Sequence, residues 1–520
     1  MHSKLIKTAI LLLSILTLSA CSGQKKTDDG PRVYNDFDIS EQVTLNGYVI
    51  GSPNPDFGKV WSKVNEMLLR DLNCTMNITY LDWGEYQAQY PLILASGENV
   101  DWIFTGHWCM YSDEAAKGAF REISKEDIST YMPRLAGYLP DLAYSQCSLD
   151  GKLYMIPSPS PDKKTDVLIL RADLADKYGV DLTKVDSFSE IGPYLNAIKE
   201  NEPEMLPLYL DNSRSLWLNM ADEFDGKIED GYGIGCFHSF DGKVLDDGIY
   251  SMFDETIFKA VLNTSLTIRD WQKKGYLNPE ALANRVTTRD TFPKGLSGVC
   301  LGNFLDTQSV LAEAAANGWE TKLILDVNAS GHSPMESYSN NGIAISAFSK
   351  HPERAMIAMD LIMNEPEYIN LIQFGIEGEH YIVTEDGKID YPEGVSASDT
   401  GYNWEETGFW FLNRDLQPLR ATWSDEYVNL RERIENEVLK DNPYMGFQLN
   451  VNPVQAEYAA VHEIMEQYHR PLELGLTEDV EGAYEKLKTL LYAAGYEKLL
   501  SEYQRQFNKY REAIDKASLH

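Results

Sequence analysis

The sequence predicts an α/β fold with a parallel β-sheet near its N-terminal end. Between Val43 and Phe104, runs that alternate apolar and polar residues, as strands do, are separated by runs with an apolar residue every three or four positions, as in amphipathic helices. The resulting order is strand, helix, strand, helix, strand, and a helix is the usual connection between parallel strands. The chain has 520 residues. A single hydrophobic core seldom organises so long a chain, so we expect two or three core units.

Each element of this region has its own sequence pattern. The expected elements are a strand ending at Ile50, a helix with Val60, Trp61, Val64, Met67, Leu68 and Leu72 on one face, a strand through Met76, Ile78 and Tyr80, a helix over 85–95 and a buried strand over 100–104. Ligands of open parallel sheets bind beyond the carboxyl ends of the strands. The segments that follow the second and third strands, Asp82-Trp83-Gly84 and Thr105-Gly106-His107-Trp108, are therefore expected at a ligand site.

The N-terminus has the pattern of a secretory signal. Basic residues precede an apolar run from Ala9 to Leu18, which is too short to span a bilayer. The run ends in Leu18-Ser19-Ala20-Cys21, which resembles the lipobox of bacterial lipoproteins. The resemblance implies that residues 1–20 are a signal peptide and that Cys21 is lipidated; an ordinary signal peptide with a chance cysteine is the alternative. Residues 21–39 are polar without an apolar period, and we expect a flexible tether.

The acidic composition excludes two classes of partner. The chain carries 80 acidic and 46 basic residues, a formal net charge of −34. This charge repels the phosphates of nucleic acid and the surface of an anionic membrane. We interpret it as a solubilising coat, and we expect contact with the membrane through the N-terminal lipid only.

Catalytic, metal and cofactor motifs do not emerge from the sequence. His462-Glu463 is followed by Ile464-Met465-Glu466, so the HExxH zinc motif lacks its second histidine. The run from Gly231 to Gly235 lacks the spacing of a dinucleotide or phosphate-binding loop. The cysteines beyond Cys21 are scattered and odd in number, which is not the pattern of a disulfide framework. We therefore predict no catalytic residue, no metal and no cofactor. Bound calcium stays open as an alternative, since the chain has an acidic stretch from Asp222 to Asp230, although its spacing does not match an EF-hand loop.

Several motifs resemble a known family when they are taken in order. They are Ala95-Ser96-Gly97-Glu98 with Val100-Asp101-Trp102-Ile103-Phe104, then Asp150 to Pro157, Val167 to Arg171, Asn340 to Ser346 and Lys350 to Ala355. In this order they resemble family 1 of the bacterial extracellular solute-binding proteins, which includes the maltose and oligosaccharide binders. Gly375-Ile376-Glu377-Gly378-Glu379-His380-Tyr381 is similar to a signature of the large-lipoprotein branch of that family, as is the long helical C-terminal tail. The resemblance covers nearly the whole mature chain.

The resemblance implies a two-lobe fold of the periplasmic-binding-protein type II, with hinged lobes and three crossings between them. On this basis lobe 1 comprises 40–165 plus 341–395, and lobe 2 comprises 166–340 plus 396–520 with the C-terminal helices. It also implies an extracytoplasmic, membrane-anchored monomer that captures a carbohydrate, expected to be an oligosaccharide, by closure of the lobes and delivers it to the transmembrane subunits of an ABC importer. The implied protein is not an enzyme.

The candidate ligand-binding residues are aromatic and polar side chains near the expected strand ends and crossings. One face of a sugar ring stacks on indole or phenol rings, while its hydroxyl groups require polar partners. The candidates are Asp82, Trp83, His107, Trp108, Asp211, Trp217, Asn303, Phe304, Tyr338, Asn340 and Trp410. For each tryptophan a place in the core, and for His107 a capping or hinge role, is the alternative.

Other functions stay open on the sequence alone. A peptide or amino-acid ligand on the same fold would require convergent basic side chains, and Arg171 and Arg214 are the basic residues near the expected cleft. A secreted carbohydrate-active enzyme would require a pair of carboxylates at a defined separation, which a count of acidic residues does not reveal. An adhesin or scaffold would show repeats or Pro/Ser/Thr-rich stalks, and neither is evident.

Overall fold

The computed structural model describes residues 32–97, 100–211, 227–229, 232–238, 245–328, 330–396 and 399–517. The predicted signal peptide and Cys21 lie outside these residues. The chain divides into two compact units, Met1–Gln42 and Val43–His520. In the first unit the described residues form a hairpin of β1 (Val33–Tyr34) and β2 (Phe37–Asp38). Among the described helices, none has both the length and the apolar character needed to span a membrane.

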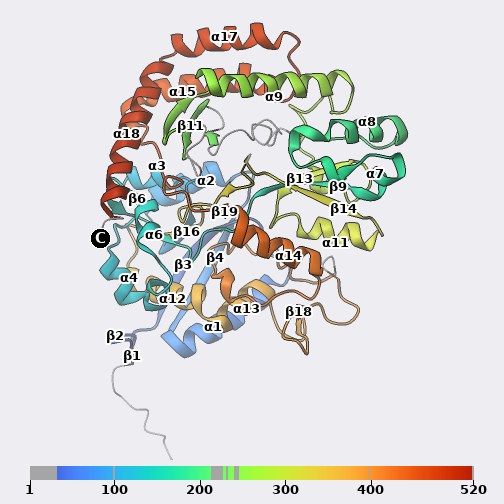
Figure 1. The fold of residues 1–520 in the computed structure, drawn as a ribbon. Coiled ribbons are helices and arrows are strands. Elements are labelled where there is room, and N and C mark those ends of the chain that lie inside the picture. Colours follow the sequence, from blue (N-terminus) through green and yellow to red (C-terminus); the bar gives the residue numbers. More distant parts are fainter. Residues whose placement is uncertain are drawn as a thin grey trace, which may run out of the picture. The chain divides into compact units, whose positions relative to one another are not determined.

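The second unit contains the predicted parallel sheet (Figure 1). It has five strands in the order β4-β3-β5-β16-β8. Their bounds are β3 (Val43–Ile50), β4 (Cys74–Leu81), β5 (Trp102–Thr105), β8 (Ile156–Pro157) and β16 (Gly342–Ile345). Strand β3 pairs in parallel with β4 and with β5, and β16 pairs antiparallel with β5 and β8. The strand, helix, strand, helix, strand order predicted from the sequence is therefore confirmed.

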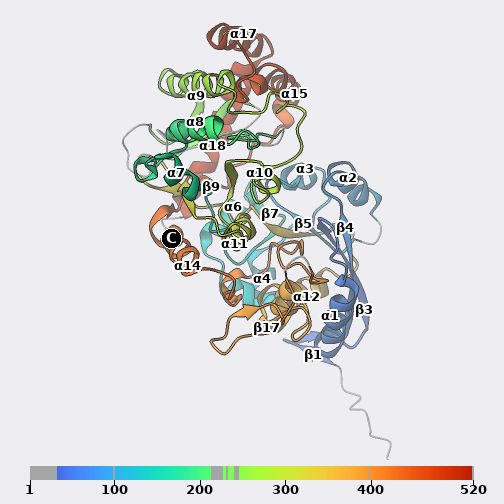
Figure 2. The same cartoon turned by 90° about the vertical axis from the view of Figure 1, so that its right-hand side faces the viewer.

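Helix α1 (Phe57–Leu72) buries the apolar face that its sequence pattern predicts. Val60, Trp61, Val64, Leu68 and Leu72 are all buried on its predicted face, and Figure 2 shows the helix running beside the strands of the sheet. The indole N–H of Trp61 donates to the carbonyl of Met76 on β4 at 2.6 Å, which fixes the helix on the sheet. The remaining helices around this sheet are α2 (Tyr86–Ser96), α3 (Tyr111–Ala116), α4 (Lys125–Tyr131), α5 (Pro133–Ala136), α6 (Asp141–Gln146), α12 (Pro352–Asn364) and α13 (Pro366–Phe374).

A second sheet has its own hydrophobic core. It consists of β9 (Asp166–Arg171) between β13 (Val299–Asn303) and β14 (Thr321–Leu325), with both pairings antiparallel. Leu168 and Leu170 of β9 are completely buried and pack with residues of the helices on one side. The helices in this part of the chain are α7 (Ala172–Tyr178), α8 (Gly192–Asn201), α9 (Glu255–Lys273), α10 (Thr288–Thr291), α11 (Gln308–Ala316) and α14 (Asp425–Arg433).

The chain passes between the two sheets three times. The first passage is 158–165, between β8 and β9. The second is 326–341, between β14 and β16, and the third is 391–424, between β18 (Ile389–Asp390) and α14. The lobe boundaries expected at 165/166, 340/341 and 395/396 lie within or directly beside these passages, and we keep them as a proposal.

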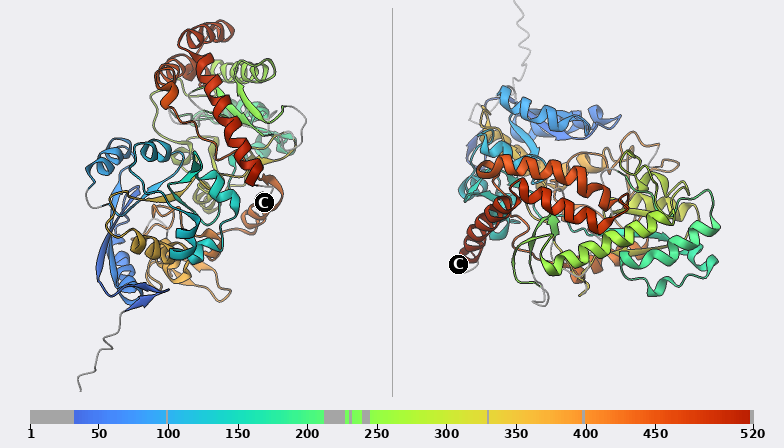
Figure 3. Two further views of the ribbon diagram at one scale, coloured as in Figure 1. Left: turned by 90° about the vertical axis from the view of Figure 1, so that its left-hand side faces the viewer. Right: turned by 90° about the horizontal axis from the view of Figure 1, so that it is seen from above.

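The C-terminal helices complete the core of the second sheet. They are α15 (Gln455–Ile464), α16 (Arg470–Glu473), α17 (Val480–Ala493) and α18 (Tyr496–Ala517). Figures 1 and 3 both show α17 beside α9, and Gly495 with a φ of +93° marks the turn into α18. The apolar stripe of α18, with Leu499, Tyr503 and Phe507, is buried in the core that contains β9. This stripe therefore serves the packing of the core.

The segment from Gly375 to Tyr381 forms a turn that requires a glycine at its first position. Gly375 has a φ of +84° and a ψ of −146°, a region in which essentially only glycine is found. A Cβ at this position would lie 2.4 Å from Nδ1 of His380. The His380 ring is 2% exposed, and its Nδ1 accepts the backbone N–H of Ile376 at 2.9 Å. The glycine therefore allows the histidine to fold back onto its own turn.

Replacing Gly375 with alanine is expected to lower the free energy of unfolding by about 3 kcal/mol, because backbone strain and the contact with His380 act together. Denaturant unfolding measures the loss. Gly387 is the matched control, since its φ is +80° but nothing lies within 4 Å of a Cβ there. Its alanine variant should lose only about 1 kcal/mol, from the backbone strain alone. Equal losses in the two variants would mean that the contact with His380 contributes nothing.

Candidate functional site

Three tryptophans from distant parts of the chain meet at one place. Trp83 follows β4, Trp108 follows β5, and Trp410 belongs to the third passage. The ring centroids of Trp83 and Trp108 are 5.9 Å apart with planes 22° from parallel. The Trp410 ring lies 5.4 Å from that of Trp83 and 6.1 Å from that of Trp108. We call these three residues the tryptophan cluster.

The tryptophan cluster has a buried base and a solvent-exposed rim. Phe104 is completely buried, and its ring lies 5.4 Å from that of Trp108 and 5.3 Å from that of Trp410. Trp83 is 52% exposed, whereas Trp108 and Trp410 are half-buried. An exposed indole on a rigid aromatic base is suited to bind a ring-shaped ligand by its face.

Tyr86 also contributes to the cluster. Its ring meets Trp83 edge-on at 5.9 Å and Trp108 at 6.5 Å. Tyr86 is not among the candidates predicted from the sequence. Its position as the first residue of α2, three after Trp83, was the available signal, because residues in the first turn of such a helix also face the carboxyl ends of the strands.

A tight turn positions Trp83. The Oδ1 of Asp82 accepts the backbone N–H of Gly84 at 2.8 Å, and its carbonyl accepts the N–H of Tyr86 at 2.8 Å. An Asp side chain that bonds two residues ahead is a common way to initiate a turn. Asp82 therefore lies at the predicted site, and its carboxylate orients the loop that carries Trp83.

The loop with His107 and Trp108 is held by the second passage. The backbone N–H of His107 donates to the carbonyl of Ser339 at 2.8 Å, and Nε1 of Trp108 donates to the carbonyl of Asn340 at 2.8 Å. This close approach depends on Gly106, since a Cβ there would lie 2.3 Å from the Asn340 carbonyl oxygen. The His107 side chain is exposed, and Tyr338, two residues before Asn340, is half-buried. The structure thus brings His107, Trp108 and Asn340 together.

Phe304 does not lie at this site. It is completely buried, and its ring stacks on that of Tyr427 with centroids 4.5 Å apart and planes 12° from parallel. It belongs to the core on one side of β9, with Val167 and Ile169. The structure therefore gives no support to the prediction that Phe304 contacts ligand, because the side chain turns into the core as the chain leaves β13.

Asn303 and Asp211, two further candidates expected in lobe 2, are not part of the tryptophan cluster. Asn303 is buried, and its amide is used locally: Oδ1 accepts the N–H of Asp306 at 2.9 Å and Nδ2 donates to the Asp306 carboxylate at 2.5 Å. Asp211 is also buried and follows Leu210, whose carbonyl accepts a hydrogen bond from Asn278. Trp217 lies outside the described residues. Asn303 and Asp211 remain proposals without the support that the tryptophan cluster receives.

One group of side chains has the composition of a metal site. Asp56, Glu379 and His380 place their ligand atoms within 4.8 Å of one another. However, Nδ1 of His380 accepts a backbone N–H, so the neutral ring carries its proton on Nε2 and donates it to Asp56 at 3.1 Å. The ammonium of Lys59 is paired with Glu379. These contacts already account for all three side chains, so the group supports no metal assignment.

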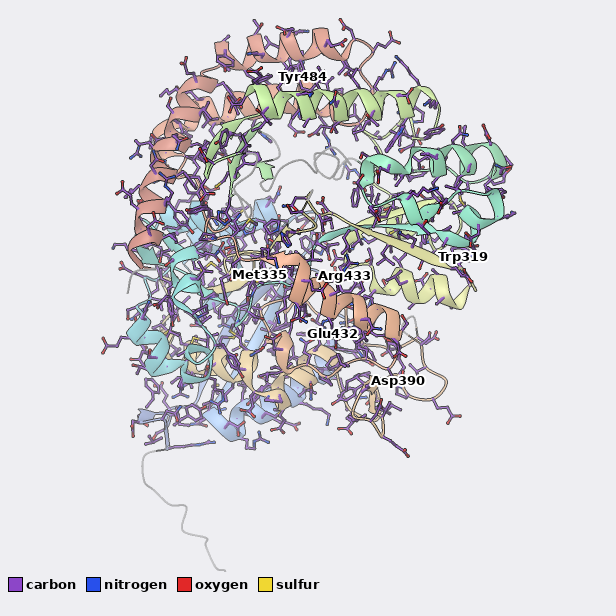
Figure 4. The ribbon with its side chains drawn as sticks, in the orientation of Figure 1. Trp319, Met335, Asp390, Glu432, Arg433 and Tyr484 are labelled. Atoms are coloured by element: carbon purple, nitrogen blue, oxygen red, sulfur yellow. The ribbon has the colours of Figure 1, made fainter. Side chains whose placement is uncertain are left out.

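A cavity of about 770 Å³ lies apart from the tryptophan cluster. It is formed by Val185 to Ser187, Ser189 and Glu190, one face of α9, strand β14 and the segment after it, together with Arg433, which Figure 4 labels. Its lining contains hydroxyl, amide and charged side chains of both signs but no aromatic ring. It shares no residue with the sequence-predicted candidates and offers no stacking surface.

The fold and the site together define the class of protein. Two sheets joined by three passages, with an aromatic cluster at the carboxyl ends of parallel strands β4 and β5, form the type II solute-binding-protein fold. Comparison with known proteins agrees with this assignment.

The chain is similar over most of its length to solute-binding proteins. It is 22% identical over 483 residues to a carbohydrate ABC transporter substrate-binding protein of Streptococcus pneumoniae, covering 91% of this chain and 92% of that protein. The crystal structure of the N-glycan transport solute-binding protein NgtS of the same species matches with a TM-score of 0.75 and 20% identity, covering 90% of this chain and 99% of the other. The alginate-binding protein AlgQ2 matches with a TM-score of 0.63 and 16% identity over 90% and 99%. Residues 443–512 match a domain of unknown function, DUF3502. These matches confirm the resemblance and the fold predicted from the sequence.

Proposed function

We propose that the protein is the solute-binding component of an ABC importer and that it captures a neutral oligosaccharide on the tryptophan cluster. The observation that carries this proposal is the meeting of Trp83, Trp108 and Trp410 beside the ends of β4 and β5, with the ring of Trp83 exposed and those of Trp108 and Trp410 half-buried. Sugar rings present C–H groups on one face, and these pack well against indole. The two further NgtS structures, in complex with Man1GlcNAc and Man5GlcNAc, match with TM-scores of 0.71 and 0.68, which supports a glycan ligand for this fold.

A neutral ligand is favoured because two basic side chains considered for the site, Arg171 at the end of β9 and Lys163 in the first passage, are already paired. Arg171 forms an ion pair with Asp173 at 2.6 Å and stacks on Trp319 at 3.7 Å. Lys163 pairs with Asp415 at 2.9 Å. An acidic ligand would have to displace such carboxylates or bind beside them, and both are unfavourable in a chain of net charge −34. Arg214, the other basic candidate, lies outside the described residues.

The finer features of this function follow from the sequence. We propose that Cys21 carries the lipid that anchors the protein to the outer face of the cell membrane, that the protein is a monomer, and that it presents its ligand to the permease subunits. We further propose that it has no catalytic activity, so a bound glycan is released unchanged. The similarity to transporter substrate-binding proteins supports this view.

A thermal-shift screen of the purified mature protein tests the proposal. A ligand at a hundredfold excess over its Kd adds about 2.7 kcal/mol to the stability of the folded state, which raises the unfolding midpoint visibly. We expect mannose and N-acetylglucosamine oligosaccharides to raise it, and alginate oligosaccharides of similar length to have no effect. Mass spectrometry should recover the glycan intact. Hydrolysis would indicate an enzyme, a response to peptides alone would indicate a different ligand class, and a response to alginate would contradict the neutral ligand.

A further inference from the structure

A single buried carboxylate connects all three passages between the two sheets. Asp162, in the first passage, is 8% exposed. Its Oδ2 accepts hydrogen bonds from the side-chain amides of Asn340 and Asn341, at 3.0 and 2.9 Å, and both belong to the second passage. Its Oδ1 lies 3.5 Å from the guanidinium of Arg414 in the third passage, and Lys164 lies 3.5 Å from Oδ2. Asn340 follows Asp162 by 178 residues and Arg414 follows Asn340 by 74, but all three passages converge on this side chain.

The electrostatic environment keeps this carboxylate charged. Burial by itself would raise the pKa of Asp162, but the positive charges of Arg414 and Lys164 and the hydrogen bond from Asn341 outweigh it, and the pKa lies below its usual value. A buried carboxylate that accepts several hydrogen bonds is held firmly, because breaking any one of them leaves the buried charge less well compensated. At neutral pH the charged carboxylate of Asp162 therefore makes strong, directional hydrogen bonds and ion pairs with the three passages.

The same side chain is linked to the tryptophan cluster through two short paths. Asn340, whose amide binds Asp162, accepts the indole N–H of Trp108 on its carbonyl at 2.8 Å. Arg414, whose guanidinium faces Asp162, follows Trp410 by four residues in the same passage. Two of the three tryptophans are thus attached to segments that Asp162 holds in place.

We propose that Asp162 is a positioning residue for ligand binding. It holds the three passages in one arrangement, so that Trp108 and Trp410 present their rings together, and it is a fixed point of the hinge about which the two sheets move. The proposal rests on the proposed function for its ligand. The link between Asp162 and Trp108 is a property of the ligand-free protein and can be tested without a ligand.

The first test is Asp162→Asn, which keeps the shape of the side chain and removes its charge. We expect the Kd for the glycan found in the screen to rise at least tenfold, because the passages no longer hold the rings in one arrangement. We also expect the tryptophan emission of the ligand-free protein to change. In a Trp108→Phe background, which keeps an aromatic ring but lacks the N–H that donates to Asn340, this emission change should be much smaller.

Asp360→Asn is the matched control. Asp360 on α12 is 1% exposed, and its carboxylate accepts the backbone N–H groups of Leu135 and Arg134 at 2.9 and 3.3 Å. The same substitution there should lower the unfolding midpoint but leave both the Kd and the tryptophan emission unchanged. If the two variants change the Kd equally, or if Asp162→Asn leaves it unchanged, Asp162 has only a structural role and the proposal is wrong.

A second variant covers the case in which Asp162→Asn does not fold. The Arg414 side chain is 34% exposed, so Arg414→Gln should be tolerated. We expect it to raise the Kd about threefold to tenfold and to change the emission in the same direction as Asp162→Asn. Unchanged values of both overturn the proposal. If the natural protein binds no glycan at all, the proposed function fails, while the emission measurements still decide the role of Asp162.

Discussion

Replacing Trp83 with alanine is expected to weaken glycan binding about 30-fold while the protein stays folded. Buried or stacked tryptophans at binding sites commonly contribute about 2 kcal/mol or more, and this value corresponds to about 30-fold in Kd. Trp83 is the most suitable member of the tryptophan cluster for the test, because it is 52% exposed and its ring contacts are with Tyr86, Trp108 and Trp410. Isothermal titration of the variant with the glycan from the screen measures the loss.

Trp319→Ala provides the control for this substitution. Trp319 is half-buried and labelled in Figure 4, and its ring packs under the guanidinium of Arg171 and against Phe292. Its removal should lower stability and leave the Kd as it is in the natural protein. An unchanged Kd in Trp83→Ala would exclude this residue from the site, and an equal rise in both variants would show that binding only follows stability.

Replacing Phe304 with alanine is expected to lower the free energy of unfolding by about 3–5 kcal/mol and to leave the Kd unchanged. Removing a buried aromatic ring loses its transfer free energy and leaves a cavity in a closely packed core. The ring is completely buried, stacked on Tyr427 at 4.5 Å and surrounded by a core that includes Val438. Denaturant unfolding and titration with glycan, made on the same preparation, separate the two effects.

The matched substitution is Phe348→Ala. Phe348 is 56% exposed, and its ring lies beside Gly97. Its replacement should change the stability by no more than about 0.5 kcal/mol. A small loss in Phe304→Ala together with a weaker Kd would restore Phe304 as a ligand contact and would contradict the placement of its ring in the core.

The sequence by itself determined the class of fold and predicted the three tryptophans that meet at the site. The period of the apolar residues identified β3, α1, β4, α2 and β5 in order. Because ligands of parallel sheets bind at the carboxyl ends of the strands, the same pattern predicts that Trp83 and Trp108 lie at the site. These inferences succeed because they depend on local periodicity and on one general rule of sheet topology, and both are present in the order of residues along the chain.

Only the tertiary structure decided which side chains face the site and what holds them there. The direction of Phe304 depends on how the chain leaves β13, and Tyr86 enters the site only through the packing of α2. Asp162 showed no local signal, since its partners Asn340 and Arg414 lie far along the chain. Such contacts form when the chain passes between two separately packed cores. For the two aromatic rings the physical reason is close packing in the core and at the site. For Asp162 it is the burial of a charge, which requires whichever polar groups the long-range packing brings to it.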